Sequence, residues 1–346
     1  MKTDMKTDIL SMYQNELSVL LEKEPSYRVN QLFSWLHKGA SFDEMTNLPL
    51  KMREELKERA FIATPKIEQK YVSKIDGTVK YLLRLYDGQC IESVVMKYEH
   101  GNTICISSQA GCKMGCKFCA STRNGFVRNL LPSEMLGQIL AAQKDTQLRI
   151  SNVVLMGIGE PLDNYDNVMK FLRLVSDENG LNIGLRHISL STCGVVDKIY
   201  ELANESLPVT LSISLHHSND ESRSSLMPIN QKWNIDSLLS ACNDYFQKTG
   251  RRISFEYAII QGVNDNNENA DALARLLKSK LKDMPFHVNL IPVNTVEGTG
   301  FTSGMKSVMQ FKNRLILQGV NATVRRKLGS DINASCGQLR RSQMEK

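Results

Sequence analysis

From residue 100 onward, short apolar runs alternate with amphipathic stretches of helical periodicity. Roughly six β/α units in succession predict a parallel sheet or an open barrel, with functional loops at the carboxyl ends of the strands. The expected strands are 103–107, 152–156, 187–191, 209–215, 253–260, 286–291 and 322–326. The expected helices between them are 132–144, 164–176, 196–205, 235–248, 265–281 and 306–318.

The first hundred residues follow other patterns. Apolar residues recur at helical spacing in 9–21 and 27–36, and 50–60 is a charged third helix. Asp-Gly pairs at 76–77 and 87–88 mark two turns between β-rich runs. The predicted fold class is therefore α/β, a parallel sheet or a partial, open parallel (β/α)6 barrel with two additions before it. The predicted organisation is a helical accessory domain over 1–68, a β-hairpin extension over 69–98, the barrel core over 99–330 and a C-terminal tail over 331–346.

The composition excludes several classes of protein. A chain of 346 residues with 42% hydrophobic residues can bury one large core and a small accessory unit. The sequence shows neither a signal peptide nor an apolar run of about 18 residues, so neither secretion nor a membrane span is expected. Eight cysteines in such a chain indicate a reducing compartment, where clustered thiols bind metals or act in catalysis. The predicted location is the cytoplasm.

Positive charge is concentrated at the carboxyl end. The net charge of the chain is +6, but residues 306–346 contain nine Lys and Arg against Asp331 and Glu345, a difference of +7. Two explanations stay open: a solvated terminal face, or a surface for a phosphate backbone.

The strongest chemical signal is a C-x3-C-x2-C run of three cysteines, Cys112, Cys116 and Cys119. Structural zinc sites use four ligands, usually as two separated pairs, and a ferredoxin-type [4Fe–4S] cluster also uses four thiolates. Three thiolates therefore leave one metal position for a ligand that is not protein, as in a [4Fe–4S] cluster with one open iron. The alternative is a zinc site completed by a distant fourth ligand, for which Cys105 is the nearest candidate.

Further motifs narrow this pattern to one family. The cysteine run, with Phe118 before its last cysteine, resembles the radical S-adenosylmethionine (SAM) superfamily. The motifs CISSQAGCKMGCKFCAS, MGIGEPLDN, LSTCGVV, SISLHHSNDESRSSLMPIN, VNLIPVN and DINASCGQL together resemble its dual-specificity adenine-C2 RNA methyltransferase family, RlmN. The resemblance extends over nearly the whole chain, including YRVNQLFSWLHKG and SFDEMTNLP near the amino terminus.

The resemblance implies an activity, cofactors and partners. It implies a radical-SAM barrel with one [4Fe–4S] cluster that uses two SAM molecules per turnover. The implied reaction methylates C2 of adenosine 2503, in the peptidyl-transferase region of 23S rRNA, and of adenosine 37 in certain tRNAs. The implied partners are 23S rRNA and tRNA, and the helical accessory domain over 1–68 is expected to be an RNA-binding domain. A further implied partner is an electron donor such as flavodoxin or ferredoxin. Association with a membrane is not expected, and the protein is expected to be a monomer.

The same resemblance assigns the cofactor-binding residues. Gly159 and Glu160 are expected to contact the methionine amino group of SAM, since a carboxylate suits an ammonium and glycine allows close backbone approach. The remaining cofactor-contacting positions are Ser191, Ser214, Leu215, His216 and Asn294.

Two more thiols and a carboxylate are implied to act on the transferred group. Cys336 matches the methyl carrier, which takes a methyl group from one SAM as S-methylcysteine. A radical then joins this carbon to the adenine, because C2 of adenine is electron-poor and not nucleophilic. Cys105 matches the thiol that resolves the protein–RNA adduct through a transient disulfide with Cys336. Glu92 lies by period-two alternation on a largely apolar strand face, and it matches the proton acceptor.

Two rival interpretations stay open. A sister family methylates C8 of the same rRNA adenosine with the same thiols, although Pro161 after Gly-Glu and the run Ile-Pro-Val-Asn at 291–294 resemble the C2 family. The other rival is a non-catalytic RNA-binding protein with a structural zinc site. Cys90, Cys193 and Cys242 match no family role and are interpreted as packing residues.

Overall fold

The structure is a computed structural model that describes residues 6–282, 284–294, 300–334 and 338–339. Most of its strands form one ten-stranded sheet, in the order β14-β13-β12-β11-β10-β9-β6-β5-β4-β3. Seven of them are parallel and follow one another in chain order: β6 (Gly101–Cys105), β9 (Ile150–Leu155), β10 (Ile188–Thr192), β11 (Thr210–Ser214), β12 (Ile253–Ile259), β13 (Phe286–Pro292) and β14 (Ala322–Val324).

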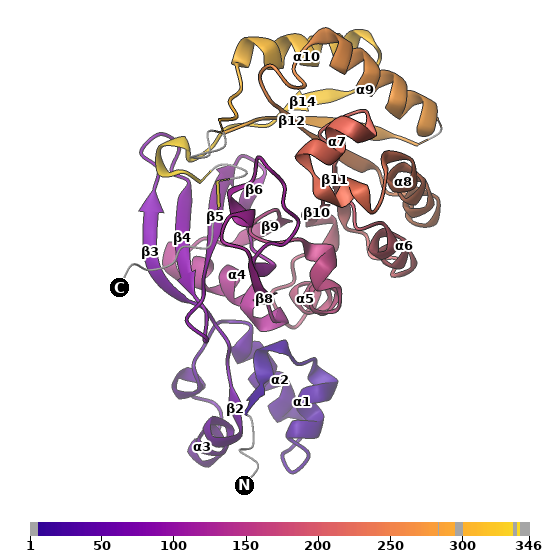
Figure 1. Cartoon of the computed structure of the whole chain (residues 1–346). Helices are drawn as coiled ribbons and strands as arrows, with labels where there is room; N and C mark the ends of the chain where they lie inside the picture. The colour runs from indigo at the N-terminus through magenta and orange to yellow at the C-terminus, as the bar shows by residue number, and fades with distance from the viewer. Residues whose placement is uncertain (1–5, 283, 295–299, 335–337, 340–346) are drawn as a thin grey trace.

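Helices connect these strands and form an arc around the sheet (Figure 1). Because consecutive strands are neighbours in space, every crossover proceeds in the same direction and the sheet curls around an axis. Within the described residues no ladder joins β14 to β3, so the barrel is open. The prediction of an open (β/α)6 barrel is confirmed. The connecting helices are α4 (Pro132–Thr146), α5 (Tyr165–Ser176), α6 (Val196–Asn204), α8 (Ile235–Thr249), α9 (Asn267–Lys280) and α10 (Met305–Leu317).

The barrel strands alternate between an apolar face and a polar face. In β10, Ile188 and Leu190 are completely buried in the apolar core, whereas Ser189 and Ser191 line cavities along the barrel axis. Successive side chains of a strand point to opposite faces, so this period of two separates the core from the axis. The apolar core therefore lies between sheet and helices, and polar side chains are available inside the barrel.

The region before the barrel adds three antiparallel strands to the same sheet. β3 (Lys66–Val72) pairs with β4 (Val79–Arg84), β4 pairs with β5 (Cys90–Tyr98), and β5 pairs with β6. Both expected turns lie between these strands. The region expected as a hairpin is thus a three-stranded extension that continues the barrel sheet through β6.

The amino-terminal helices form a layer at the bottom of Figure 1, next to the barrel. The helix expected over 9–21 is interrupted, because Met12 and Tyr13 have extended backbone. The Ser133 hydroxyl at the start of α4 donates to Asp8 and joins this layer to the barrel. The elements are β1 (Thr7–Asp8), the 3-10 helix η1 (Ile9–Ser11), α1 (Gln14–Leu20), α2 (Tyr27–Leu36), η2 (Phe42–Glu44), α3 (Leu50–Arg59) and β2 (Ala60–Phe61).

The connections between barrel strands and helices, and the segment after β14, contain short elements that periodicity did not predict. Pieces this short hold too few residues to show a period. The short elements are β7 (Gln109–Gly111), η3 (Ala120–Thr122), β8 (Phe126–Asn129), η4 (Pro161–Asn164), η5 (Leu185–His187), α7 (Asp220–Leu226), η6 (Pro228–Gln231) and η7 (Ser330–Ile332).

None of the helices in the described part of the chain is long and apolar enough to cross a membrane.

Candidate active site

One cavity opens at the carboxyl ends of the barrel strands, and the cysteine loop forms part of its wall. A barrel presents its functional residues at this end. Leu215 alone among the predicted cofactor and cluster residues does not line it, because its side chain is completely buried in the apolar core. The predicted residues that line the cavity are Cys112, Cys116, Cys119, Gly159, Glu160, Ser191, Ser214, His216 and Asn294.

A short ladder between β7 and β8 holds both ends of the cysteine loop. At Gly111, where the loop leaves β7, φ is 80° and any side chain would collide with the carbonyl oxygen of Gly125. Glycine is therefore required at this position. Inside the loop, the backbone N–H of Lys117 donates to the carbonyl of Leu226 at 3.0 Å, so α7 supports the loop from the other side.

All three thiols line the same cavity. Among the described residues, no three His, Cys, Asp or Glu side chains are placed to hold a single metal ion. A [4Fe–4S] cluster uses a set of thiolates differently, because each thiolate binds a different iron. Burial raises the pKa of Cys112 to about 12. Burial, together with the thiols of Cys119 and Cys112, also raises the pKa of Cys116. Thiolates in such a place need a cationic partner, so the donor set fits an iron–sulfur cluster.

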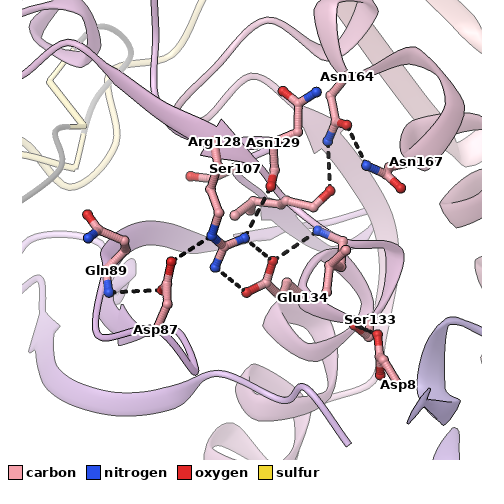
Figure 2. A network of polar contacts seen from close by, with 12 residues as sticks. Asp8, Asp87, Gln89, Ser107, Arg128, Asn129, Ser133, Glu134, Asn164 and Asn167 are labelled. Atoms are coloured by element: carbon pink, nitrogen blue, oxygen red, sulfur yellow. Dashed lines mark hydrogen bonds and ion pairs between the residues drawn. The ribbon is translucent and has the colours of Figure 1, made fainter. Parts of the chain in front are cut away.

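Arg128 on β8 joins the cysteine loop to its surroundings (Figure 2). Its guanidinium donates to both carboxylate oxygens of Glu134, at 2.7 and 2.8 Å, and to Asp87 at 2.6 Å. Glu134 lies in the first turn of α4 and is buried, whereas Asp87 lies in the β4–β5 turn. Burial alone lowers the pKa of Arg128, but the hydrogen bonds to Glu134 and Asp87 raise it overall. The network anchors the loop to the helices and to the antiparallel extension.

Glu160 follows β9 and presents a buried carboxylate to the cavity. The backbone N–H groups of Cys193 and Leu162 donate to its two oxygens at 2.7 and 3.0 Å. Burial raises the pKa of this carboxyl in spite of these donors. At Gly159, φ is 106° and any side chain would clash with Gln109. The segment thus holds an oriented carboxylate of the kind that binds an ammonium group.

His216 lies just after β11 and is neutral. The backbone N–H of Ala258 donates to Nδ1 of His216 at 2.9 Å, which leaves Nε2 as the protonated nitrogen. Burial, together with the nearby Arg223, lowers the pKa of His216 to about 3. The ring meets Phe118 of the cysteine loop edge-on, with 4.8 Å between ring centroids. The cavity therefore contains an uncharged hydrogen-bond donor beside the loop.

Arg223 supports the site and was missed in the sequence. It is 1% exposed and donates to the carbonyls of Cys193, Ser214 and Leu215 at 2.8, 3.0 and 3.1 Å. These carbonyls lie at or just beyond the ends of β10 and β11, so one guanidinium holds two neighbouring strand ends together. The residue lies inside one of the family motifs, but nothing in a polar stretch marks an arginine as buried.

Glu256 and Arg325 are further cavity residues that were not predicted. Glu256 projects from β12 and is 3% exposed. Asn289 donates to its carboxylate at 2.7 Å, and Nη1 of Arg325 lies 3.8 Å from the same group. Burial raises the pKa of Glu256, against the effect of Arg325 and these donors. A lone acid inside the apolar run of β12 was the available signal.

Glu92 and Cys105 share a face of the sheet beside the cavity. Cys105 is opposite Val94, and Glu92 lies two residues before Val94, so both side chains project to one side. Nζ of Lys80 lies 3.3 Å from the Glu92 carboxylate, and the two side chains are 11% and 6% exposed. The same Nζ donates to the carbonyl of Asn333 at 3.4 Å. The extension thus brings the predicted proton acceptor and the predicted resolving thiol close to the C-terminal segment.

The C-terminal segment, defined as residues 329–334, is attached to the turn between β3 and β4. The N–H of Gly329 donates to Asp76 at 2.9 Å. Asp331 accepts from the Ser73 hydroxyl at 2.7 Å and from the N–H of Lys74 at 2.9 Å. These contacts join parts of the chain that are more than 250 residues apart.

A contact beyond this segment returns to the cysteine loop. The carbonyl of Leu339 accepts from the buried Ser121 hydroxyl at 2.7 Å, two residues after Cys119. The predicted methyl carrier, Cys336, lies outside the described residues. Its described neighbours on the two sides therefore contact the antiparallel extension and the cysteine loop.

An open β/α barrel with a three-cysteine loop after its first parallel strand defines the class of radical SAM proteins. In agreement, residues 106–274 match the Radical SAM superfamily. Residues 7–62 match the ribosomal RNA large subunit methyltransferase N-terminal domain.

Several proteins resemble the chain over nearly its whole length. A probable dual-specificity RNA methyltransferase RlmN of Clostridium novyi (strain NT) is 53% identical over 340 residues, which cover 97% of this chain and 98% of that protein. One of the same name from Alkaliphilus oremlandii (strain OhILAs) is 53% identical over 344 residues, 98% of this chain and 99% of that one. A crystal structure of a radical SAM methyltransferase from Sphaerobacter thermophilus matches with a TM-score of 0.91 and 40% identity, over 96% and 99% of the two chains. This chain belongs to the dual-specificity RNA methyltransferase RlmN family of radical SAM enzymes.

Proposed function

We propose that the protein methylates C2 of an adenosine in the peptidyl-transferase region of 23S rRNA, and of the adenosine next to the anticodon in certain tRNAs. One observation carries the proposal: two half-sites lie side by side on one sheet. The first is the cavity with its three thiols and the Glu160 carboxylate. The second is the sheet face with Cys105 and Glu92, to which the C-terminal segment is attached. The names of the relatives support RNA as the substrate class.

The first half-site suits SAM and a cluster. Cys112, Cys116 and Cys119 would hold a [4Fe–4S] cluster, which when bound supplies the electron that breaks a carbon–sulfur bond of SAM. Glu160 offers its carboxylate to the methionine ammonium group. His216 offers an N–H without adding positive charge. The buried walls exclude water from the reacting groups.

The second half-site suits methyl transfer through the protein. Cys336 would accept the methyl group of one SAM and deliver its carbon to the adenine, and a bound cluster with a second SAM would supply the radical chemistry that removes a hydrogen atom from that methyl group. Glu92 then takes the proton from C2 of the adduct. Attack of the Cys105 thiol on the sulfur of Cys336 breaks the bond between this sulfur and the transferred carbon, which takes up a proton and leaves with the RNA as the product methyl group. The two cysteines are left as a disulfide. An external thiol must reduce this disulfide before the next turnover.

The remaining partners follow from this chemistry. The cluster must be reduced by a one-electron donor, for which we propose flavodoxin or ferredoxin. We also propose that the protein works as a monomer in the cytoplasm, where its RNA substrates are found.

Mass spectrometry of modified nucleosides tests the proposal. Anaerobically reconstituted protein is incubated with SAM, a reductant and transcripts of the rRNA region or of tRNA. The expected product is 2-methyladenosine, and the Cys105→Ala variant should accumulate protein–RNA adduct instead of product. Formation of 8-methyladenosine would assign the protein to the C8 reaction. A colourless protein with zinc and no iron would refute the enzyme assignment.

A further inference from the structure

We propose that a second cleft, beside the cofactor cavity, binds the sugar–phosphate backbone of the unpaired RNA nucleotide that carries the target adenine. The inference rests on the proposed function and places its substrate on the protein. The cleft lies between the ends of β5 and β13 and residues 325–328. Its lining includes Met96, Tyr98, Pro292, Arg326, Lys327 and Leu328.

The cleft is continuous with both half-sites. Ile291, Asn294 and Arg325 line the cleft and also the cofactor cavity. Ala334, the last described residue of the C-terminal segment, lines the cleft as well. A nucleotide bound here is therefore next to the place of SAM and next to the segment that leads to the methyl carrier. The proposed reaction requires this arrangement, because the adenine must reach groups from both half-sites.

The cationic side of the cleft suits a phosphodiester. Arg326 and Lys327 are exposed, and within the described residues neither makes a hydrogen bond or an ion pair. Arg314, in the same basic region, is instead paired with Asp271 at 2.7 Å. Two neighbouring exposed cations attract the phosphates of a nucleic acid.

The apolar side of the cleft suits an unstacked base or sugar. The ring of Tyr98 is partly buried and stacks on His100, with 5.2 Å between centroids and 19° between planes. Aromatic side chains beside a basic groove are typical of single-stranded RNA sites, where freed bases stack on the ring. A paired adenine would stay inside its helix, so the cleft selects an unpaired or flipped-out nucleotide.

RNA binding by charge-reversal variants tests the cleft. The dissociation constant of the full-length holoprotein for an rRNA hairpin with the target adenosine in its loop is measured over a salt series. The double variant R326E/K327E should bind at least 10-fold more weakly. The slope of log K against log salt should also decrease by about 1.4, since each phosphate contact in single-stranded nucleic acid contributes about 0.7. The matched control is Lys306→Glu, an exposed charge on α10 in the same basic region that lines none of these cavities, and it should bind within twofold of wild type.

Two further variants test the aromatic side. Tyr98→Leu should weaken binding roughly 10-fold, because base–aromatic stacking is lost, whereas Tyr98→Phe should bind like wild type. Methylation of Cys336 without RNA, measured by intact mass, should be unchanged in R326E/K327E, because that step uses no RNA atom. Unchanged methylation would also show that the variant is folded and carries its cofactors.

The outcomes separate this inference from the proposed function. Wild-type affinity in R326E/K327E, while wild-type protein forms 2-methyladenosine, would overturn the cleft and leave the function intact. Loss of affinity in R326E/K327E but not in Lys306→Glu supports the cleft. If that loss occurs and the wild-type protein forms no 2-methyladenosine, the cleft is an RNA site and the proposed function is wrong.

Discussion

The cofactor cavity and the C-terminal segment lie on the same sheet but differ in the burial of the residues that hold them in place. In the cavity, Glu160 is 4% exposed and Arg223 is 1% exposed, and backbone groups of neighbouring strand ends hold both. In the C-terminal segment, Asp331 and Asn333 are exposed, and their partners belong to the turn before β4 and to β4 itself. One region is built into the barrel, and the other rests on its edge.

The difference matches what each region is proposed to do. Groups that orient a cofactor benefit from a rigid, water-poor surrounding, in which their hydrogen bonds are not exchanged with solvent. A segment that must present one sulfur first to SAM and then to RNA needs contacts that open at low free-energy cost. Preorganisation is therefore expected at the cavity, and local opening at the C-terminal segment.

The largest effect should follow the loss of a cluster ligand. In Cys112→Ala, the iron content and the visible absorbance of anaerobically purified protein should collapse, and RNA methylation should fall below detection. The matched control is Cys242→Ala, a buried cysteine in α8 that packs in the core and does not line the cofactor cavity, and this variant should keep its iron. A brown, iron-loaded Cys112→Ala protein would contradict the ligand assignment.

Among the contacts around the cavity, the Arg128 network that anchors the cysteine loop should contribute most to the free energy of unfolding. Arg128→Met leaves the Glu134 carboxylate, with a side chain 1% exposed, without its cation. The free energy of unfolding in urea should fall by about 3 kcal/mol, as for other broken buried pairs. Arg173→Met breaks the more exposed pair with Glu205, with side chains 46% and 26% exposed, and should cost less than about 1 kcal/mol. Equal losses in the two variants would show that the network does not anchor the loop.

The cavity should also respond to acid through His216, whose pKa is lowered from 6.5 to about 3. Between these values the unfolded chain binds a proton that the folded protein does not bind. The stabilisation by neutral His216 is thus complete above pH 6.5 and declines as the pH falls, by up to about 1.4 kcal/mol per pH unit.

His216→Asn provides the test of this slope. Asparagine can accept the Ala258 N–H and tolerates the φ of 58° at this position. Urea unfolding at pH 7, 6 and 5 should show a smaller loss of stability in the variant than in wild type. Burial also lowers the pKa of His37, His217 and His287, which contribute the loss of stability with falling pH that remains in both proteins. An equal loss of stability between pH 7 and pH 5 in both proteins would mean that His216 is charged in the folded state.

The smallest effect should be found at the C-terminal segment. Asp331→Ala should leave global unfolding unchanged and accelerate hydrogen exchange of the Lys74 amide and of peptides covering 329–334. Acid should have the same effect, because the hydrogen bond from Ser73 lowers the pKa of Asp331 below its usual 3.8. The contact is therefore present at neutral pH and is lost as the pH falls through that lowered value. Asp43→Ala, which breaks an exposed ion pair with Lys57 elsewhere in the fold, is the control. Unchanged exchange would show that these contacts do not hold the segment.

Local patterns predicted much of the fold. The helix expected over 27–36 coincides with α2, and each expected barrel strand overlaps an observed one. Such elements depend on periodicity within a few turns or residue pairs, which a sequence displays directly. The break at Met12 and Tyr13 and the short helix α7 were missed, because packing decides them. The boundaries of the four predicted domains stay predictions.

The sequence by itself determined the barrel and the three-thiol loop, since β/α alternation and cysteine spacing are properties of nearby residues. Its motifs also determined which cavity residues to expect. Only the tertiary structure decided which charges support them: Arg223 under two strand ends, and Lys80 between Glu92 and Asn333. Lys80 and Asn333 are 253 positions apart, and attachment of the C-terminal segment to the turn between β3 and β4 brings them together. The sequence does not indicate whether a polar residue is buried, so these partners could be identified only in the folded structure.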